Sequence, residues 1–391
     1  MASVMRSYVS IIYRTRLSFR PHSTVARRNP SYYQAAHYYP VRIGDVFHAS
    51  YQVAGKLGYV AYSTSWLCRD LHAKNYTVLK VSTSLPDHLN ATDRELKVYE
   101  HMTSIDSSHP GRSFIRELYD SFDLQGPGST HRCLVMQPMH MTLLEMVGMN
   151  PRPFDLPLLK MTVKRLLLTL DFLHAEAGVI HTGRNLRATD ILMLSLEDSS
   201  MLANFATAES ERPSPRNRRL RRPAKYGLTV LCNFGEARVG RTHESGPFVQ
   251  PHIYRAPQVI FEMPWGSAID IWNLAGLIWD LFEGQHLFGD IFASKGGHDP
   301  FKHLALMVAL IGPPPSDFVR RSETMEQCFD TSGSWIAHEE APVTPVSLER
   351  LEQRLVGEDK ELLLAFIRSM LKWMPEERKT ARQLLDHPFL S

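Results

Sequence analysis

The sequence predicts an α+β protein in which a small strand-rich part precedes a larger helical part. Residues 51–81 and 132–138 contain segments rich in residues that favour β-strands, and these segments are bounded by residues that favour turns. Residues 157–174 carry apolar side chains at helical spacing, and residues 268–282 are apolar almost all round, which is typical of a buried helix. Strands near the start and helices in the remainder therefore define the expected architecture.

Composition and charge exclude several classes of protein. The 391 residues are 43% hydrophobic and 22% charged, which is ordinary for a soluble globular protein. A net charge of +3 is too small to indicate a nucleic-acid or membrane partner, and no apolar run reaches the about 18 residues of a membrane-spanning helix. The 4 cysteines form no C-x-x-C pair, so we expect free thiols in a reducing compartment.

The first 44 residues form a basic extension. They contain several arginines and no acidic residue before Asp45. This composition is typical both of a mitochondrial presequence and of a disordered basic tail, and the two interpretations stay open. We expect a cytoplasmic or nuclear protein, with mitochondrial import as the alternative. The fold is expected to begin near residues 39–44.

A hairpin and a third strand open the folded part. Residues 51–57 and 59–68 are predicted to be two strands hinged at Gly58, and residues 76–81 the third strand. The predicted helices follow at residues 90–103, 157–174, 268–282, 303–312, 361–371 and 380–385.

Two polar loops, each entered from a short apolar strand, are the candidate functional segments. The first lies between residues 179–180 and residues 191–194, and the second, residues 233–238, follows residues 229–232. Loops held by rigid strands are where binding and catalytic side chains concentrate. The intervening residues 195–228 are polar and basic, and we expect a solvated loop there, with a targeting or nucleic-acid role as the alternative.

These two loops resemble the catalytic loop and the Asp-Phe-Gly segment of protein kinases, specifically of SR-protein kinases and their short fungal relatives. Those kinases begin the loops with His-Thr-Asp and Asp-Phe-Gly-Glu-Ala, whereas this chain has His-Thr at 181–182 and Asn-Phe-Gly-Glu-Ala at 233–237. Further kinase-like motifs occur at residues 254–258, 270–274 and 373–381, in the family's order.

The resemblance covers roughly residues 45–390 and implies a two-lobed protein-kinase fold. It places an N-lobe, small and rich in strands, at residues 45–138. A larger helical C-lobe follows at residues 139–390, with the basic loop at residues 195–228 inside it. Residues 1–44 remain outside the domain.

The resemblance also implies a site for ATP in the N-lobe. The family's glycine-rich loop is present as Leu57-Gly58, but Val60 replaces its second glycine, and a β-branched residue does not readily take a positive φ. Met136 corresponds to the segment that joins the lobes beside the nucleotide.

Lys80 lies in Thr-Val-Leu-Lys-Val, which resembles the family's strand with the phosphate-contacting lysine. The resemblance pairs it with Glu95 on the next helix. Glu95 also has capping-box spacing to Thr92, which is a purely structural use for the same carboxylate. Taken alone, Lys80 is better interpreted as a solvated lysine on a strand face.

The residues that carry chemistry in the family have changed here. Matching both ends of the first loop makes Gly183-Arg184 an insertion. Asn185 then takes the position of the catalytic base and Arg187 that of the phosphate-contacting lysine. The two metal-binding positions become Asp190 and Asn233, which implies weakened Mg²⁺ binding because hard cations prefer carboxylates.

Four further residues match structural positions of the family. His181 opens the catalytic loop, and Asp270 corresponds to the aspartate that holds the backbone of that loop. A buried carboxylate needs such hydrogen bonds. Gln258 replaces a glutamate that normally pairs with an arginine, here Arg378. Losing one member of a buried pair costs about 3 to 5 kcal/mol.

The resemblance therefore implies a serine/threonine kinase that transfers the γ-phosphoryl group of ATP to a protein, with impaired catalysis. The alternatives are a pseudokinase that binds nucleotide or a partner protein, and a gene-model artefact at Gly183-Arg184. We expect a monomer whose partners are ATP and a protein, with neither membrane nor nucleic acid among them. Paired arginines at 320–321, in the region where SR-protein kinases have an acidic groove, argue against Arg-Ser substrates.

Overall fold

The structure is a computed structural model in two compact units. The N-terminal unit lies within residues 24–146 and 189–239, and the C-terminal unit within residues 147–188 and 240–391. The described residues are 35–60, 62–84, 91–126, 129–143, 145–146, 153–183, 192–195, 200–212, 227–244, 249–293 and 297–391. None of the helices in these ranges is both long and apolar enough to cross a membrane.

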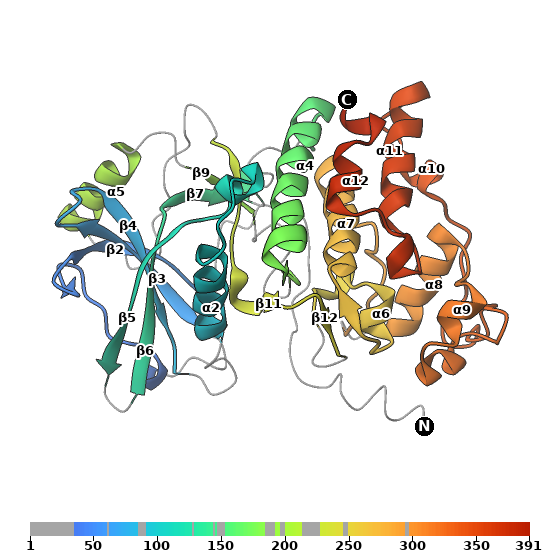
Figure 1. Ribbon diagram of the computed structural model, residues 1–391, viewed down its shortest axis with the longest axis horizontal. Coiled ribbons are helices and arrows are strands. Elements are labelled where there is room, and N and C mark those ends of the chain that lie inside the picture. Colours follow the sequence, from blue (N-terminus) through green and yellow to red (C-terminus); the bar gives the residue numbers. More distant parts are fainter. Residues whose placement is uncertain are drawn as a thin grey trace. The chain divides into compact units, whose positions relative to one another are not determined.

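The N-terminal unit is built on a 6-stranded antiparallel sheet (Figure 1). Its strand order is β1-β2-β3-β4-β6-β5. The strands are β1 (Val46–Phe47), β2 (Tyr51–Val60), β3 (Ser63–Asp70), β4 (Tyr76–Ser82), β5 (Leu118–Gly126) and β6 (Ser129–Met136). All of the strands predicted for residues 51–138 are present, and the hairpin of β2 and β3 leads into β4 as expected.

The hairpin differs from the prediction in the place of its turn. Gly58 does not end the strand, because it lies inside β2 opposite Ser65, and pairing continues to Val60 opposite Ser63. Tyr59 and Val60 are strong strand formers, and a register shift between Lys56 and Gly58 lets the ladder pass the glycine. The hairpin therefore reaches further than its glycine predicts.

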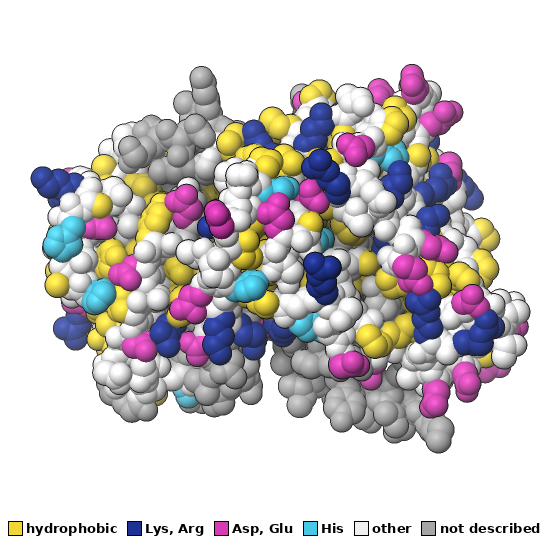
Figure 2. All heavy atoms as spheres, in the orientation of Figure 1, with side chains coloured by type: hydrophobic (Ala, Val, Ile, Leu, Met, Phe, Trp, Pro, Cys, Tyr) yellow, Lys and Arg dark blue, Asp and Glu magenta, His cyan; other side chains and the backbone are white. Residues whose placement is uncertain are grey.

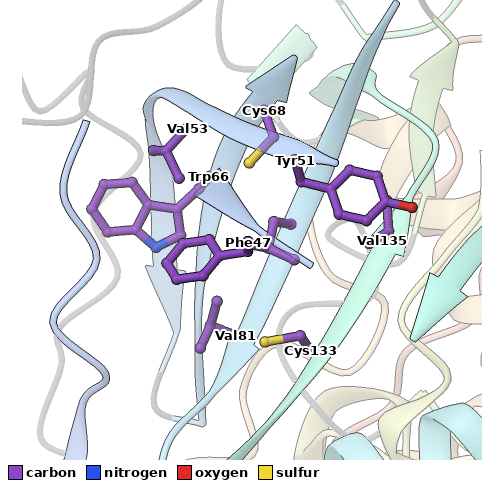
Figure 3. Close-up of a cluster of buried hydrophobic side chains, with 9 residues drawn as sticks. Phe47, Tyr51, Val53, Trp66, Cys68, Val81, Cys133 and Val135 are labelled. Atoms are coloured by element: carbon purple, nitrogen blue, oxygen red, sulfur yellow. The ribbon is translucent and has the colours of Figure 1, made fainter. Parts of the chain in front are cut away.

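One face of the sheet carries an apolar core (Figure 3). Alternate residues of each strand point to the same face, so Trp66 and Cys68 of β3 lie beside Val81 and Cys133 from the neighbouring strands. Tyr39 and Val41 pack against this core. All 4 cysteines are free thiols, as predicted.

The opposite face of the sheet is covered in part by a helix that the sequence analysis missed. Residues 195–228 were expected to be a solvated loop, but α5 (Ser200–Glu211) lies within them. Its Leu202 and Phe205 are buried against Leu67 of β3. A Cβ at Gly55 of β2 would stand 2.8 Å from the Phe205 ring, so this strand is fitted closely to the helix.

A helix and a small sheet complete the N-terminal unit. The helix is α2 (Ala91–Thr103), and the 3-stranded sheet has the order β10-β9-β7. Its strands are β7 (Met139–Thr142), β9 (Leu192–Ser195) and β10 (Thr229–Leu231). The unit therefore extends past the predicted N-lobe boundary at residue 138, because β9 and β10 pair with each other and β9 with β7.

The C-terminal unit is helical, as predicted. Its central helix α7 is buried almost along its whole length and packs against α4 and α11 (Figure 1). Asp155 caps the start of α4, and Gly178 in left-handed conformation ends the turn of π-helix that continues it. The main helices are α4 (Leu156–Asp171), α7 (Ala268–Glu283), α8 (Pro300–Ile311), α11 (Gly357–Met370) and α12 (Ala381–Leu385).

Candidate active site

Lys80 and Glu95 form a buried ion pair in the N-terminal unit. β4 supplies the ammonium group and α2 the carboxylate, and their side chains are 11% and 1% exposed. The predicted pairing is therefore present. The hydroxyl half of the competing capping box is absent, because the hydroxyl of Thr92 is buried without a hydrogen-bond partner. A charge pair shielded from water interacts more strongly than a surface pair, so Lys80 is held in one place.

Tyr62, the residue before β3, lies between Lys80 and the second polar loop. Its hydroxyl donates a hydrogen bond to the side-chain oxygen of Asn233 at 3.2 Å. Its ring faces the ammonium group of Lys80, which lies 5.3 Å from the ring centroid. These distances bring together two residues that the sequence predicted as site members and one that it did not.

Asn233 has a defined place because the residues that follow it are anchored. It adopts a left-handed conformation with φ of 69°, which asparagine tolerates better than most residues. Phe234 is buried edge-on against Tyr99 of α2, with ring centroids 5.4 Å apart. Arg94 of α2 binds both the Gly235 carbonyl and the Glu236 carboxylate. The loop is thus fixed to α2 within one unit.

The residues expected to contact ATP lie on strands of the same unit. Met136 is buried at the end of β6, and Leu57 and Gly58 lie in β2. Leu57 packs against the apolar cluster that α5 forms with the sheet. A pocket of about 490 Å³ beside Gln137 and Pro138 is lined by Leu202 of α5, but its described lining residues include none of those expected to contact ATP. The side chain of Val60 lies outside the described residues.

The metal-binding prediction is only partly within the described residues. Asn233 offers an amide oxygen that already accepts the hydrogen bond from Tyr62. No cluster of three or more His, Cys, Asp or Glu side chains suited to a metal ion occurs in the described ranges. The described part of this site therefore fits Mg²⁺ poorly, since this cation prefers carboxylate and phosphate oxygens. Asn185, Arg187 and Asp190 lie outside the described residues.

Asp270 organises the start of the first polar loop in the C-terminal unit. Its carboxylate accepts hydrogen bonds from the backbone N–H groups of His181, at 2.8 Å, and Thr182, at 2.9 Å. His174 lies 3.0 Å from the same carboxylate. Burial alone would raise the pKa of Asp270, but these hydrogen bonds and the nearby histidines hold that pKa below its usual value. The predicted structural contact is present.

Gly183 follows Thr182 in a left-handed conformation, with φ of 56°. A Cβ at this position would stand 2.5 Å from the side-chain amide of Asn273. Both the backbone conformation and the close approach therefore favour glycine. Gly183 is the first residue of the insertion that the match to SR-protein kinases implies, two positions before Asn185.

Gln258 and Arg378 meet as predicted. Arg378 donates to the Gln258 side-chain oxygen at 2.9 Å and to the backbone carbonyls of Ala268 and Lys372. Its guanidinium also stacks over Trp272, 4.9 Å from the ring. Burial lowers the pKa of Arg378 to about 9, and the amide nitrogen of Gln258 has no hydrogen-bond partner.

The paired arginines at 320–321 are both matched by acids. Arg320 binds Asp317, and Arg321 binds Glu376. Figure 2 shows basic and acidic side chains interspersed over the face of the C-terminal unit that it presents. The arginines therefore carry little unbalanced charge, and the argument against Arg-Ser substrates stays a prediction.

Sequence reasoning missed two features of the site. The segment Leu202, Phe205 and Ala206 has helical spacing, and that signal could have identified α5. The inward position of Tyr62 had no comparable signal, because a tyrosine in a hairpin is as easily exposed as buried. Tyr59 of the same hairpin is 48% exposed, whereas Tyr62 is 5% exposed.

Comparisons with known proteins agree with this geometry. Residues 51–390 match the family model of the protein kinase domain. A serine/threonine protein kinase of Aspergillus fumigatus is 39% identical over 367 residues, which cover 90% of this chain and 87% of that protein. The serine/threonine-protein kinase SRPK of Physarum polycephalum is 29% identical over 92% of this chain and 90% of its own. A mouse SRSF protein kinase is 34% identical over 40% of this chain and 28% of its own.

Proposed function

Because this chain belongs to the protein kinase family, we propose that it is a serine/threonine kinase of the SR-protein kinase type whose phosphoryl transfer is impaired. Protein kinase domains in general use ATP and Mg²⁺ and act on proteins. One observation carries the proposal of impairment. The Lys80–Glu95 pair is formed, whereas the neighbouring Asn233 brings no charge and is bonded to Tyr62.

The first polar loop supports the same proposal from its residue types. Phosphoryl transfer needs a group that receives or orients the proton of the attacking hydroxyl. Asn185, at the base position, has an amide that cannot take up a proton at neutral pH. The loss of a general base typically costs about 10²- to 10⁴-fold in rate.

A transfer assay on the purified full chain tests the proposal. We expect Mg²⁺-dependent phosphate transfer from ATP to a basic serine-containing peptide to be far slower than the about 1 to 100 s⁻¹ of ordinary kinases. A wild-type rate of about 1 s⁻¹ or more would overturn the proposal of impairment.

Reversion of the altered residues then tests the assignment. Asn185→Asp restores the base and Asn233→Asp restores the metal charge, so the double variant should exceed the product of the two single effects. Deleting Gly183-Arg184 in addition should realign the loop, where about 1 Å can cost 10²-fold. Asn204→Asp, the same chemical change on the exposed face of α5, is the matched control and should leave the rate unchanged.

A pseudokinase that binds nucleotide or a partner protein is the second candidate. The contact between Tyr62 and Asn233 favours it, because it leaves the metal position satisfied by the chain itself. The two candidates separate in the reversion series. Nucleotide binding without any transfer, even in the triple variant, would support the pseudokinase and overturn the impaired kinase.

A further inference from the structure

Tyr62 lies between Lys80 and Asn233 in the N-terminal unit and contacts both. The ring is 5% exposed and lies over the Lys80 ammonium, and the hydroxyl is bonded to the Asn233 oxygen. The backbone holds it there as well, because the carbonyl of Tyr62 accepts a hydrogen bond from the Thr83 N–H at 2.9 Å. The backbone of Tyr62 is therefore fixed by a hydrogen bond to the residue that follows β4.

The same two partners are those that a nucleoside triphosphate needs. In the proposed function, Lys80 contacts the phosphates and Asn233 stands at a metal position. A polyphosphate chain with its metal ion therefore competes with Tyr62 for both. An adenine nucleoside has no phosphates and therefore does not need to contact either residue.

We infer that Tyr62 determines the ligand class of this site, by selecting adenine ligands without a metal-bound triphosphate over MgATP. This inference rests on the proposed function, because it assumes that the site takes adenine ligands at all. A nucleoside leaves the tyrosine in place. MgATP binds only after the ring has left the Lys80 ammonium and the hydroxyl has left Asn233.

The expected size of the effect follows from the two contacts. One hydrogen bond and one shielded cation–π contact must break, and each is worth roughly a factor of three to thirty in an equilibrium constant. Tyr62 should therefore weaken MgATP binding by about ten- to a hundredfold, and adenosine binding hardly at all.

Calorimetric titration of the full chain with adenosine and with MgATP tests the inference. For Tyr62→Ala we expect MgATP affinity to rise by about ten- to a hundredfold while adenosine affinity stays within about twofold. Tyr119→Ala is the matched control, because Tyr119 lies on β5 of the same unit, outside the glycine-rich segment, and is 48% exposed. It should leave both affinities unchanged.

Tyr62→Phe keeps the test decisive if the alanine variant does not fold. It retains the ring over Lys80 and removes only the hydrogen bond to Asn233, so MgATP affinity should rise by about three- to tenfold. Equal changes for adenosine and MgATP, or weaker MgATP binding in either variant, would overturn the inference while leaving the proposed nucleotide site intact. Failure of wild type and of every variant to bind either ligand would instead overturn the proposed function, and the inference with it.

Discussion

The positions where the kinase pattern has buried carboxylates differ between the two units. In the C-terminal unit, Asp270 is retained and its carboxylate binds two backbone N–H groups and His174. In the N-terminal unit, Asn233 stands where the pattern has a metal-binding aspartate, and it accepts a hydrogen bond from Tyr62. The carboxylate that supports the backbone is kept, and the one that would bind a cation is not.

The difference shows that the fold and the chemistry depend on separate residues. Removing the Asp270 side chain would leave buried backbone donors without an acceptor, which is costly. Replacing an aspartate by Asn233 leaves an acceptor of similar shape, and the structure satisfies it internally. A chain can therefore keep the kinase architecture while its phosphate and metal site changes.

The largest expected effect is at Asp270. Asp270→Ala leaves the His181 and Thr182 N–H groups unpaired inside the protein, and each buried unsatisfied donor costs about 1 to 3 kcal/mol. We expect a loss of about 3 kcal/mol, seen as a fall in Tm of about 6 to 12 °C by calorimetry. Asp317→Ala, which removes an exposed carboxylate paired with Arg320, should shift Tm hardly at all.

The next effect is expected in the N-terminal unit, at the interface between α5 and the sheet. Phe205→Ala empties a buried site against Gly55 and Leu67 and should cost about 3 kcal/mol. Asn204→Ala, on the exposed face of the same helix, should cost less than about 0.5 kcal/mol. Thermal unfolding of the two variants compares them. Equal shifts would mean that α5 is not packed on the sheet in solution.

A third effect appears on acidification. His303 is fully buried beside Phe288 and His298, and burial, followed by the positive charge of Arg255, lowers its pKa to about 3. The unfolded chain binds this proton near pH 6.5, so the unfolded state holds more protons than the folded state below that value. Burying His303 in its neutral form therefore carries no protonation penalty above pH 6.5. Below that value the free energy of unfolding falls as the pH falls toward 3.

The measurement is the free energy of unfolding between pH 7 and pH 5. We expect His303 to account for a loss of about 1.4 kcal/mol per pH unit below pH 6.5. His303→Gln should lower stability at pH 7 but flatten the slope below pH 6.5. An unchanged slope in this variant would show that His303 is not held neutral in the folded state.

Features determined by neighbouring residues in the sequence were predicted correctly more often than features determined by tertiary contacts. The helix at residues 157–174 was predicted from the helical spacing of its apolar residues, and the buried helix around Trp272 from its nearly continuous apolar sequence. Both signals lie within the helix itself, and both helices are present. The Lys80–Glu95 pair followed from the family's order of strand and helix. The roles assigned to Asn185, Arg187 and Asp190 stay predictions, because these residues lie outside the described ones.

The errors arose where neighbours distant in sequence decide the outcome. Gly58 suggested a turn, but the residues after it pair with β3 and carry the strand onward. The segment around Phe205 looked like a polar loop because most of residues 195–228 are polar and basic, although its few apolar residues suffice for one buried face. The direction of Tyr62 depends on Lys80 and Asn233, which its own surroundings in the sequence do not reveal.

The smallest expected effect is at Gln258, the second amide that stands in place of a carboxylate. It differs from Asn233 because it still accepts a hydrogen bond from the family's arginine, Arg378, at 2.9 Å. Its amide nitrogen, however, is buried without a partner, and burial disfavours the charge of Arg378. Gln258→Glu replaces the unpaired donor by a second acceptor beside a guanidinium that has lost its counter-charge.

Gln258→Glu should therefore raise the free energy of unfolding at pH 7, by about 1 kcal/mol. The gain is modest because charge-assisted hydrogen bonds are only about twice as strong as neutral ones, and the new carboxylate must be desolvated. Chemical denaturation measures it, with Gln353→Glu at an exposed position as the matched control that should change stability by less than about 0.5 kcal/mol. A loss of stability at position 258 would mean that desolvation outweighs the restored pairing. The amide would then be the better partner for Arg378, and the C-terminal unit, like the N-terminal one, would have adapted to the absence of its carboxylate.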